Sequence, residues 1–442
     1  HIGSISFTLF FSRSSNSRIR TGPANMDDKM QRVTLVWRHM FLNLIVLVAP
    51  FQSRNLYVAK LAGGDLGKTV AWQSYMSASA ALLEFIMNPL LGRVSDRFGR
   101  KVFLLLSPLI NFVLKAAVVL TDGNSLPIVA ADRVLGGAIT TVGGSTTCAA
   151  AISDMLKGPD LAGALGNLGS YAGMGVLIGP FISGQILAVS GKVKFTYLFA
   201  AVIAAFQLAY NSLCFKETLE KPKPMDLSAC NPLTFLKIFT RDRTVSRVTL
   251  VAGLQCFPEG KSLADMNMAH ISNILKMGQQ MQTLFVSGFG TSMMLAGRLP
   301  KLLIPNYLSQ RNFTTASNYL TVVALTLWGA TKNPTVFFAG LCLLGPSMER
   351  RTATSAMATD LAVASGFGKG EFQGCFANWR ALCVAAAPLL YGTVVQKLPS
   401  VPGSAYFSAA LITFLTELIF RCIPPEKLEV PKEQEASGTK KA

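Results

Sequence analysis

Long apolar blocks alternate with short polar segments along most of the chain. Each block runs for about 18 to 25 residues, enough for a helix to cross roughly 30 Å of hydrocarbon. Because ordinary core helices of soluble proteins are shorter, the pattern predicts an all-α membrane protein with about twelve transmembrane helices. The predicted spans lie near residues 33–51, 72–91, 102–120, 126–152, 162–189, 195–215, 248–274, 281–299, 316–331, 335–361, 375–395 and 405–423.

A charged stretch that contains several prolines divides these spans into two sets of six. Two matching sets are typical of transporters built as a pair of helical bundles around one central passage. The span near residues 248–274 is the least regular, since Pro258, Glu259 and Asp265 interrupt it. The predicted domains are a cytoplasmic N-terminal tail at 1–32, a six-helix bundle at 33–215, a cytoplasmic linker at 216–247, a second six-helix bundle at 248–423 and a cytoplasmic C-terminal tail at 424–442.

Charge supports the membrane interpretation. Charged residues make up 14% of the chain, whereas a soluble domain has about 25%. The net charge of +18 would raise the question of nucleic acid in a soluble protein, but the basic residues lie mainly between apolar blocks. Because basic loops stay on the cytoplasmic side, the segment from Arg93 to Lys101 and the basic linker predict that both termini are cytoplasmic.

The chain termini and the cysteines give no indication of a catalytic or metal-binding site. Residues 1–25 have the Ser- and Arg-rich composition of an organellar transit peptide, but Met26 offers a natural start, and we favour an upstream tail. The 8 cysteines are scattered singly through apolar segments, which favours packing over metal binding. We expect no enzyme activity, no cofactor, no metal and no nucleic acid partner, because the motifs for these functions are missing from the sequence.

The strongest local motif is Gly92-Arg-Val-Ser-Asp96-Arg97-Phe-Gly99-Arg100-Lys101, between the second and third spans. Physically, a glycine at position 99 permits a tight turn between two helices. The motif resembles the signature loop of the major facilitator superfamily, G-x-x-x-D-R-x-G-R-K. The resemblance implies the major facilitator fold, with two six-helix bundles that rock about a central cavity under the control of this turn.

A second motif lies in the fifth span. The segment Gly175-x-x-x-Gly179-Pro180-x-x-Ser183-Gly184 resembles the fifth-span motif of the drug:proton antiporter branch of that superfamily. Small residues four positions apart let helices pack closely. The resemblance implies a hinge that seals one side of the pathway, although small residues alone also serve ordinary packing.

Shorter segments in both halves of the chain also resemble segments of this superfamily. Asp154 matches an acidic position that pairs in the family with the turn arginine, here taken as Arg97. The segments Lys216-Glu-Thr-Leu219 and Gly370-Glu371-Phe-Gln373-Gly374 are similar to segments of tetracycline exporters. The second half departs from the pattern, since Lys301 stands where an aspartate would repeat Asp96. The residues that we expect to form the conformational gate are Gly92, Asp96, Arg97, Gly99, Arg100, Asp154, Gly175, Gly179, Pro180 and Gly184.

Ionisable residues inside the spans are the candidates for proton coupling or for the substrate pocket, because charge at membrane depth is costly and marks functional sites. These candidates are Glu84, Asp132, Arg133, Glu259, Asp265 and Arg380. Arg133 begins a segment that resembles a family motif implicated in proton transfer. The alternative is that Glu84, Glu259 and Asp265 form fixed salt bridges with Arg38, Lys115, Lys261 or Arg380. Towards the cytoplasmic end of the tenth span, the run from Glu349 to Arg351 either gates or binds an anionic substrate, or snorkels to the interface.

The sequence therefore predicts a monomeric secondary transporter that moves a small organic solute across a lipid bilayer by alternating access. The antiporter-like fifth span and the membrane carboxylates favour proton-coupled export, with protons as the second partner. Two alternatives stay open at this point. One is facilitative or proton-coupled uptake of a metabolite, and the other is a membrane receptor that transports nothing.

Overall fold

A computed structural model describes residues 26–156, 158–219, 231–296, 299, 303–304, 307–348 and 350–428, and all regular secondary structure in these ranges is helical. The first half contains α1 (Met26–Val48), α2 (Phe51–Leu61), α3 (Leu66–Phe98), α4 (Arg100–Leu120), α5 (Leu126–Ala131), the π-helical η1 (Asp132–Gly136), α6 (Gly137–Thr141), the π-helical η2 (Val142–Thr146), α7 (Thr147–Met155), α8 (Gly158–Ser190) and α9 (Lys194–Cys214).

The second half begins with short helices that lie within the stretch assigned to the linker. Its elements are η4 (Pro232–Phe235), α10 (Leu236–Arg241), α11 (Arg243–Leu254), α12 (Gly260–Asn273), α13 (Gln279–Ala296), α15 (Gln310–Ala330), α16 (Pro334–Met348), α17 (Arg350–Ala364), α18 (Lys369–Lys397), α19 (Ser404–Arg421) and η5 (Pro425–Lys427).

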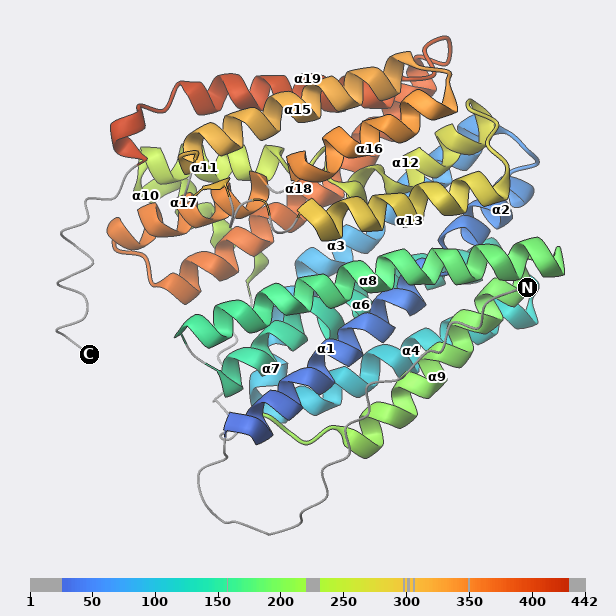
Figure 1. Cartoon of the computed structure of the whole chain (residues 1–442), viewed down its shortest axis with the longest axis horizontal. Helices are drawn as coiled ribbons and strands as arrows, with labels where there is room; N and C mark the ends of the chain where they lie inside the picture. The colour runs from blue at the N-terminus through green and yellow to red at the C-terminus, as the bar shows by residue number, and fades with distance from the viewer. Residues whose placement is uncertain are drawn as a thin grey trace, which may run out of the picture.

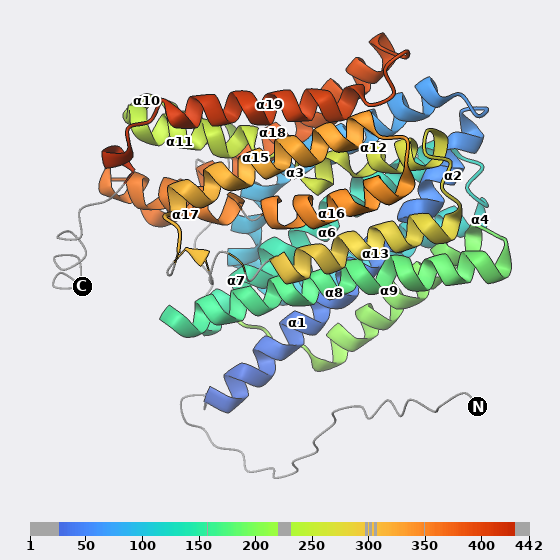
Figure 2. The ribbon, with the colours of Figure 1, turned by 45° about the horizontal axis from the view of Figure 1, so that its top comes forward.

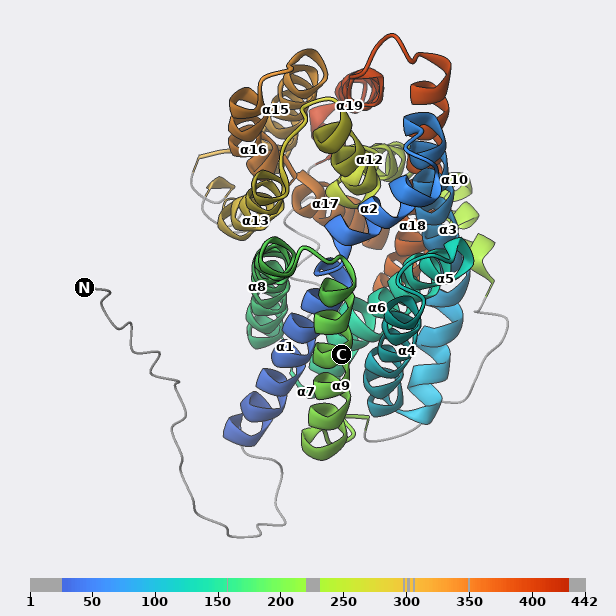
Figure 3. The same cartoon turned by 90° about the vertical axis from the view of Figure 1, so that its right-hand side faces the viewer.

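The long helices lie side by side as an elongated bundle (Figure 1). Helices α1, α4, α8 and α9 occupy one side, and α13, α15, α16 and α19 occupy the other. Figure 2 shows α1, α8 and α9 below α15, α16 and α19, and Figure 3 shows the separation from the end. The two sides meet where α8 packs on α13 and where α3 packs on α18. The predicted all-α architecture is confirmed.

Several spans are broken rather than continuous. The first breaks at Pro50, which separates α1 from α2, because proline cannot donate the helical hydrogen bond. The fourth contains two π-helical turns, and π-bulges occur often at functional sites. The seventh breaks between α11 and α12, where the sequence pattern was least regular, with Glu259 as the N-terminal cap residue of α12.

Six helical segments in the described ranges are long and apolar enough to cross a membrane by themselves. They are Asp27–Leu61, Arg100–Leu120, Leu126–Met155, Ala164–Ser190, Lys194–Cys214 and Ser404–Arg421. Helix α12, by contrast, carries the buried polar residues Asp265, Asn267 and His270. Polar side chains at membrane depth face the protein interior rather than lipid, as these three residues of α12 do.

Candidate gate and charged pathway

The turn between α3 and α4 is held by a compact ion-pair network. Gly99 ends α3 with φ of +97°, a left-handed conformation that glycine adopts without steric cost. The Arg100 guanidinium pairs with Asp96 at 2.5 Å and with Asp154, at the end of α7, at 3.0 Å. The prediction of Arg97 as the partner of Asp154 is wrong, because Arg97 is exposed and its guanidinium lies over the Phe98 ring instead.

Glu217 closes the same turn from the end of the first half. Its carboxylate accepts hydrogen bonds from the backbone N–H groups of Arg100 at 2.9 Å and Lys101 at 3.0 Å, which are free donors at the start of α4. Burial alone would raise the pKa of Glu217, but hydrogen bonds from Leu219, Arg100, Lys101 and Thr218 outweigh burial and lower it. This contact gives the Lys216–Leu219 segment a structural role that its sequence alone did not reveal.

The glycines of α8 allow close approach to two neighbouring helices. A Cβ atom on Gly175 would lie 2.7 Å from both Leu44 Cβ and the Phe41 carbonyl oxygen of α1. A Cβ on Gly184 would overlap the side chain of Thr283 of α13, on the other side of the molecule. Pro180 lies inside α8 between these two contacts. The fifth-span motif therefore packs against both halves at short range.

Asp265 on α12 contacts arginines of the first half. We use the name charged pathway for the set of charged residues that consists of Arg54, Arg133, Glu259, Asp265, Arg350, Arg351 and Arg380. The Oδ2 atom of Asp265 accepts from Arg133 Nη2 at 3.0 Å and from the Ser77 hydroxyl, while Arg54 Nη2 lies 3.6 Å from Oδ1. The Asp265 and Arg133 side chains are each about 9% exposed. Arg54 was not predicted, because the first span was expected to end near residue 51, whereas helix α2 continues to Leu61. Ser77 lies within the predicted second span and was missed because the candidates were chosen among ionisable residues.

Asp132 belongs to a different, neutral pair. Lys115 Nζ lies 3.0 Å from Asp132 Oδ1, and both side chains are 2% exposed or less. Adjacent helical residues point in different directions, so Asp132 and its neighbour Arg133 have separate partners. Glu84 of α3 accepts a hydrogen bond of 3.0 Å from the Thr141 hydroxyl. Lys115 therefore pairs with Asp132, a carboxylate for which no salt-bridge partner was predicted.

Glu259 lies among arginines at the broken seventh span. Its two carboxylate oxygens lie 3.3 Å from Arg380 Nη2 and 3.5 Å from Arg351 Nη1. The neighbouring Arg350 is 1% exposed and donates to the Gln255 carbonyl oxygen at 3.2 Å. Snorkelling to the interface is therefore wrong for Arg350. Glu349, Gly297, Arg298 and Lys301 lie outside the described residues, so the second-half counterpart of the turn does too.

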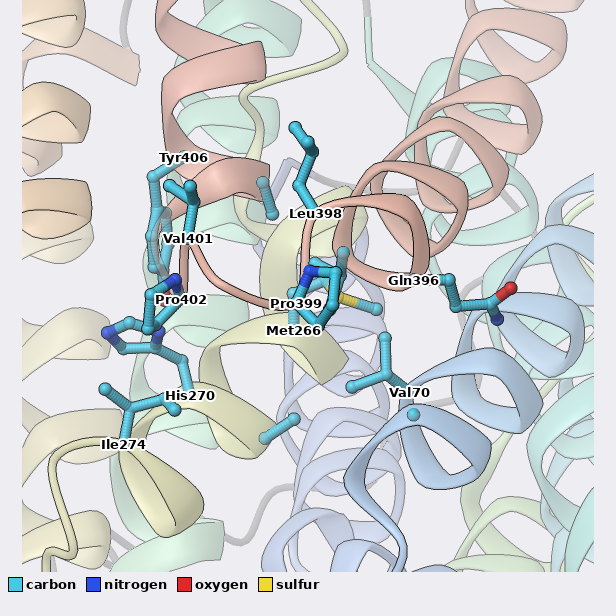
Figure 4. A pocket seen from close by; sticks show the side chains of 14 residues that line it. Val70, Met266, His270, Ile274, Gln396, Leu398, Pro399, Val401, Pro402 and Tyr406 are labelled. Atoms are coloured by element: carbon cyan, nitrogen blue, oxygen red, sulfur yellow. The ribbon is translucent and has the colours of Figure 1, made fainter.

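A largely apolar cavity of about 260 Å³ lies at the end of the molecule opposite α10, between α3, α12, α18 and α19 (Figure 4). Val70, Met266, His270 and Tyr406 are among its lining residues. The His270 ring stacks on Phe337 at a centroid distance of 5.8 Å.

Known proteins resemble this chain in sequence and in fold. The profile described as Major Facilitator Superfamily matches residues 42–394. Tetracycline resistance protein class H of Pasteurella multocida is 31% identical over 144 residues, which are 32% of this chain and 34% of that protein. The class C protein of Escherichia coli is 32% identical over 175 residues, 39% of this chain and 41% of that protein. The matches to these two proteins thus span less than half of their length.

The crystal structure of the human organic anion transporter MFSD10 (TETRAN) shares the fold with a TM-score of 0.65 at 19% identity. The match covers 89% of this chain and 99% of that one. The family profile covers most of the sequence and agrees with the helices and the charged turn. The chain belongs to the major facilitator superfamily, a family of membrane transporters rather than enzymes, and it is a multi-pass membrane protein.

Proposed function

We propose that this transporter exports a small organic molecule in exchange for protons. The tetracycline and multidrug resistance proteins among its relatives support an export role, although the matched segments cover only part of each. The fifth-span glycines, whose contacts reach both α1 and α13, support a mechanism in which the two halves move against each other.

The observation that carries proton coupling is the position of Asp265. This carboxylate of the second half accepts from Arg133 and Ser77 of the first half. Protonation would remove its charge and so weaken its attraction to Arg133 and Arg54. A proton arriving from one side would thus loosen the contact between halves, and its release on the other side would restore it.

The turn at Gly99 supplies the second element of the proposed cycle. Arg100 is held by Asp96 and Asp154, which lie on two different helices of the first half. We place this turn on the cytoplasmic side, with both termini, because basic residues gather there. We further propose that the six spans of each half, near residues 33–215 and 248–423, move as units and that one copy of the chain suffices for transport.

Flux measurements in proteoliposomes test coupling. We expect tetracycline and a panel of amphipathic fluorescent dyes to accumulate against their gradients when a pH gradient is imposed, in the direction opposite to proton flow. Asp265→Asn keeps the shape of the side chain but removes its titration, so uphill transport should be lost while downhill exchange persists. Lys115→Met with Asp132→Leu, which removes a neutral buried pair elsewhere, serves as the matched variant. Transport whose rate and direction ignore the imposed pH gradient would exclude proton coupling.

Facilitative transport of a metabolite is the second candidate, and the neutral Lys115–Asp132 pair favours it. In that case the charged groups are fixed partners and no group changes its protonation during the cycle. Equal downhill flux at every imposed pH gradient, in both the natural protein and Asp265→Asn, would favour this candidate.

A further inference from the structure

Guanidinium groups outnumber carboxylates along the charged pathway. Two carboxylates of the second half, Glu259 and Asp265, face five arginines, and the arginines are Arg54, Arg133, Arg350, Arg351 and Arg380. Among the described side chains this leaves three positive charges in excess. Counting Glu84 of α3 as well still leaves two, and the Lys115–Asp132 pair adds nothing because it is neutral.

The excess is greatest around Glu259. Each of its carboxylate oxygens already faces one guanidinium, from Arg380 and from Arg351. Arg350 has no carboxylate partner among the described side chains and contacts the Thr321 hydroxyl and the carbonyl oxygens of Ser347 and Gln255. Its Nε is buried without a hydrogen-bond partner there. Three cations therefore share one anion.

The three arginines differ in how far a solute can reach them. The Arg351 side chain is 53% exposed and that of Arg380 is 23% exposed, whereas Arg350 is 1% exposed. A negatively charged group can thus contact Arg351 and Arg380 directly. The positive charge of the buried Arg350 then attracts the same group from a greater distance. Planar guanidinium groups bind carboxylate, sulfonate and phosphate oxygens through paired hydrogen bonds.

Among the described side chains this positive charge is uncompensated, and such charge is costly inside a membrane protein, so it favours a negatively charged partner. We propose that the transported solute is a small organic anion, whose acidic group binds Arg351 and Arg380 beside Glu259. This inference rests on the proposed transport function and specifies the chemical class of the transported substrate. The bound anion would compete with Glu259 for the two guanidinium groups, and a cation of the same size would be repelled by them.

Matched ligands that differ only in charge test the inference. The probes are benzenesulfonate, benzenesulfonamide and trimethylanilinium, together with aryl carboxylates and aryl phosphates to distinguish the kinds of anion. Benzenesulfonate stays ionised over the whole working pH range, so it does not leak through lipid as a neutral acid. We expect aryl anions to raise the Tm of the full chain in nanodiscs, and the neutral and cationic analogues to leave it unchanged.

Arg351→Gln is the first variant, because this exposed side chain is the least needed for folding, and Arg380→Gln is the second. Each should weaken anion stabilisation, whereas Arg32→Gln, an exposed arginine of α1 paired with Asp28, should not. Stabilisation by trimethylanilinium or benzenesulfonamide equal to that by the anions would overturn the inference, as would anion stabilisation that survives in both variants or a Tm that no probe raises.

Flux separates this inference from proton coupling. If benzenesulfonate binds and is transported downhill at a rate that a pH gradient does not change, proton coupling is excluded and the anion site is supported. If a pH gradient drives uphill transport of trimethylanilinium and no aryl anion is transported, proton coupling is supported and the anion site is excluded.

Discussion

At the scale of single residues, two features of the structure require a glycine at position 99, the backbone conformation and the close approach of Glu217. The backbone of Gly99 has φ of +97°, and a Cβ there would overlap the carboxylate of Glu217. An alanine would therefore be strained and would also push away the carboxylate that caps α4. The glycine of the signature turn is explained by the contact with Glu217 as much as by the turn itself.

We predict that Gly99→Ala destabilises the protein by more than Gly64→Ala does. Gly64 has a similar φ of +79°, but a Cβ atom added there would have nothing within 4 Å. Gly64→Ala therefore isolates backbone strain, which costs about 1–3 kcal/mol. The difference in Tm between the two variants in detergent measures the displaced Glu217. Equal losses of Tm would mean that the Glu217 contact contributes nothing.

Glu217→Gln should show how the lowered pKa of this carboxyl affects stability. The group is more weakly protonated in the folded than in the unfolded protein, so its contribution is fully present above the ordinary glutamate pKa and is lost as pH falls through the lower folded value. The natural protein should therefore have the higher Tm at pH 7, with a gap that narrows below pH of about 4.5. A gap that widens on acidification would contradict this assignment.

At the scale of helices, the sequence predicted the spans better than their breaks and partners. The apolar blocks and the turn motif are local, so one sequence suffices to place them. The partner of Asp265 depends on how α12 is rotated against η1 and on the extension of the first span through α2, neither of which a periodic pattern fixes. The pairing of Asp154 with Arg100 rather than Arg97 likewise follows from which face of the turn points to α7.

Gly175→Ala should separate α8 from α1. The added methyl would lie 2.7 Å from a carbonyl oxygen of α1, and backbone cannot yield as a side-chain end can. Overpacking of this kind costs about 1–3 kcal/mol. Gly169→Ala is the control in the same helix, because that site is exposed and open and alanine favours helix there. The Tm should fall for the first variant and hold or rise for the second.

At the scale of the whole molecule, polar contacts between the halves concentrate toward the end opposite α10. Asn55 of α2 donates to Ser272 of α12 at 3.2 Å, and Thr283 of α13 donates to Gln52 at 3.2 Å. Asp265 lies in the same set of contacts. An alternating cycle must break these contacts together, which is why a single protonation that weakens the Asp265 bridge is an effective trigger in the proposed mechanism.

Relative motion of the halves predicts that a covalent link between α8 and α13 stops transport. A Cβ on Gly173 would lie 3.5 Å from Met294 Cβ, within the range that a disulfide spans. In a background without the native cysteines, oxidation of Gly173→Cys with Met294→Cys should abolish flux, and reductant should restore it. Each single variant should transport equally with and without oxidant. Because the link joins the two halves without touching the charged pathway, unchanged flux in the oxidised double variant would mean that α8 and α13 stay together throughout the cycle and that the halves move about this contact.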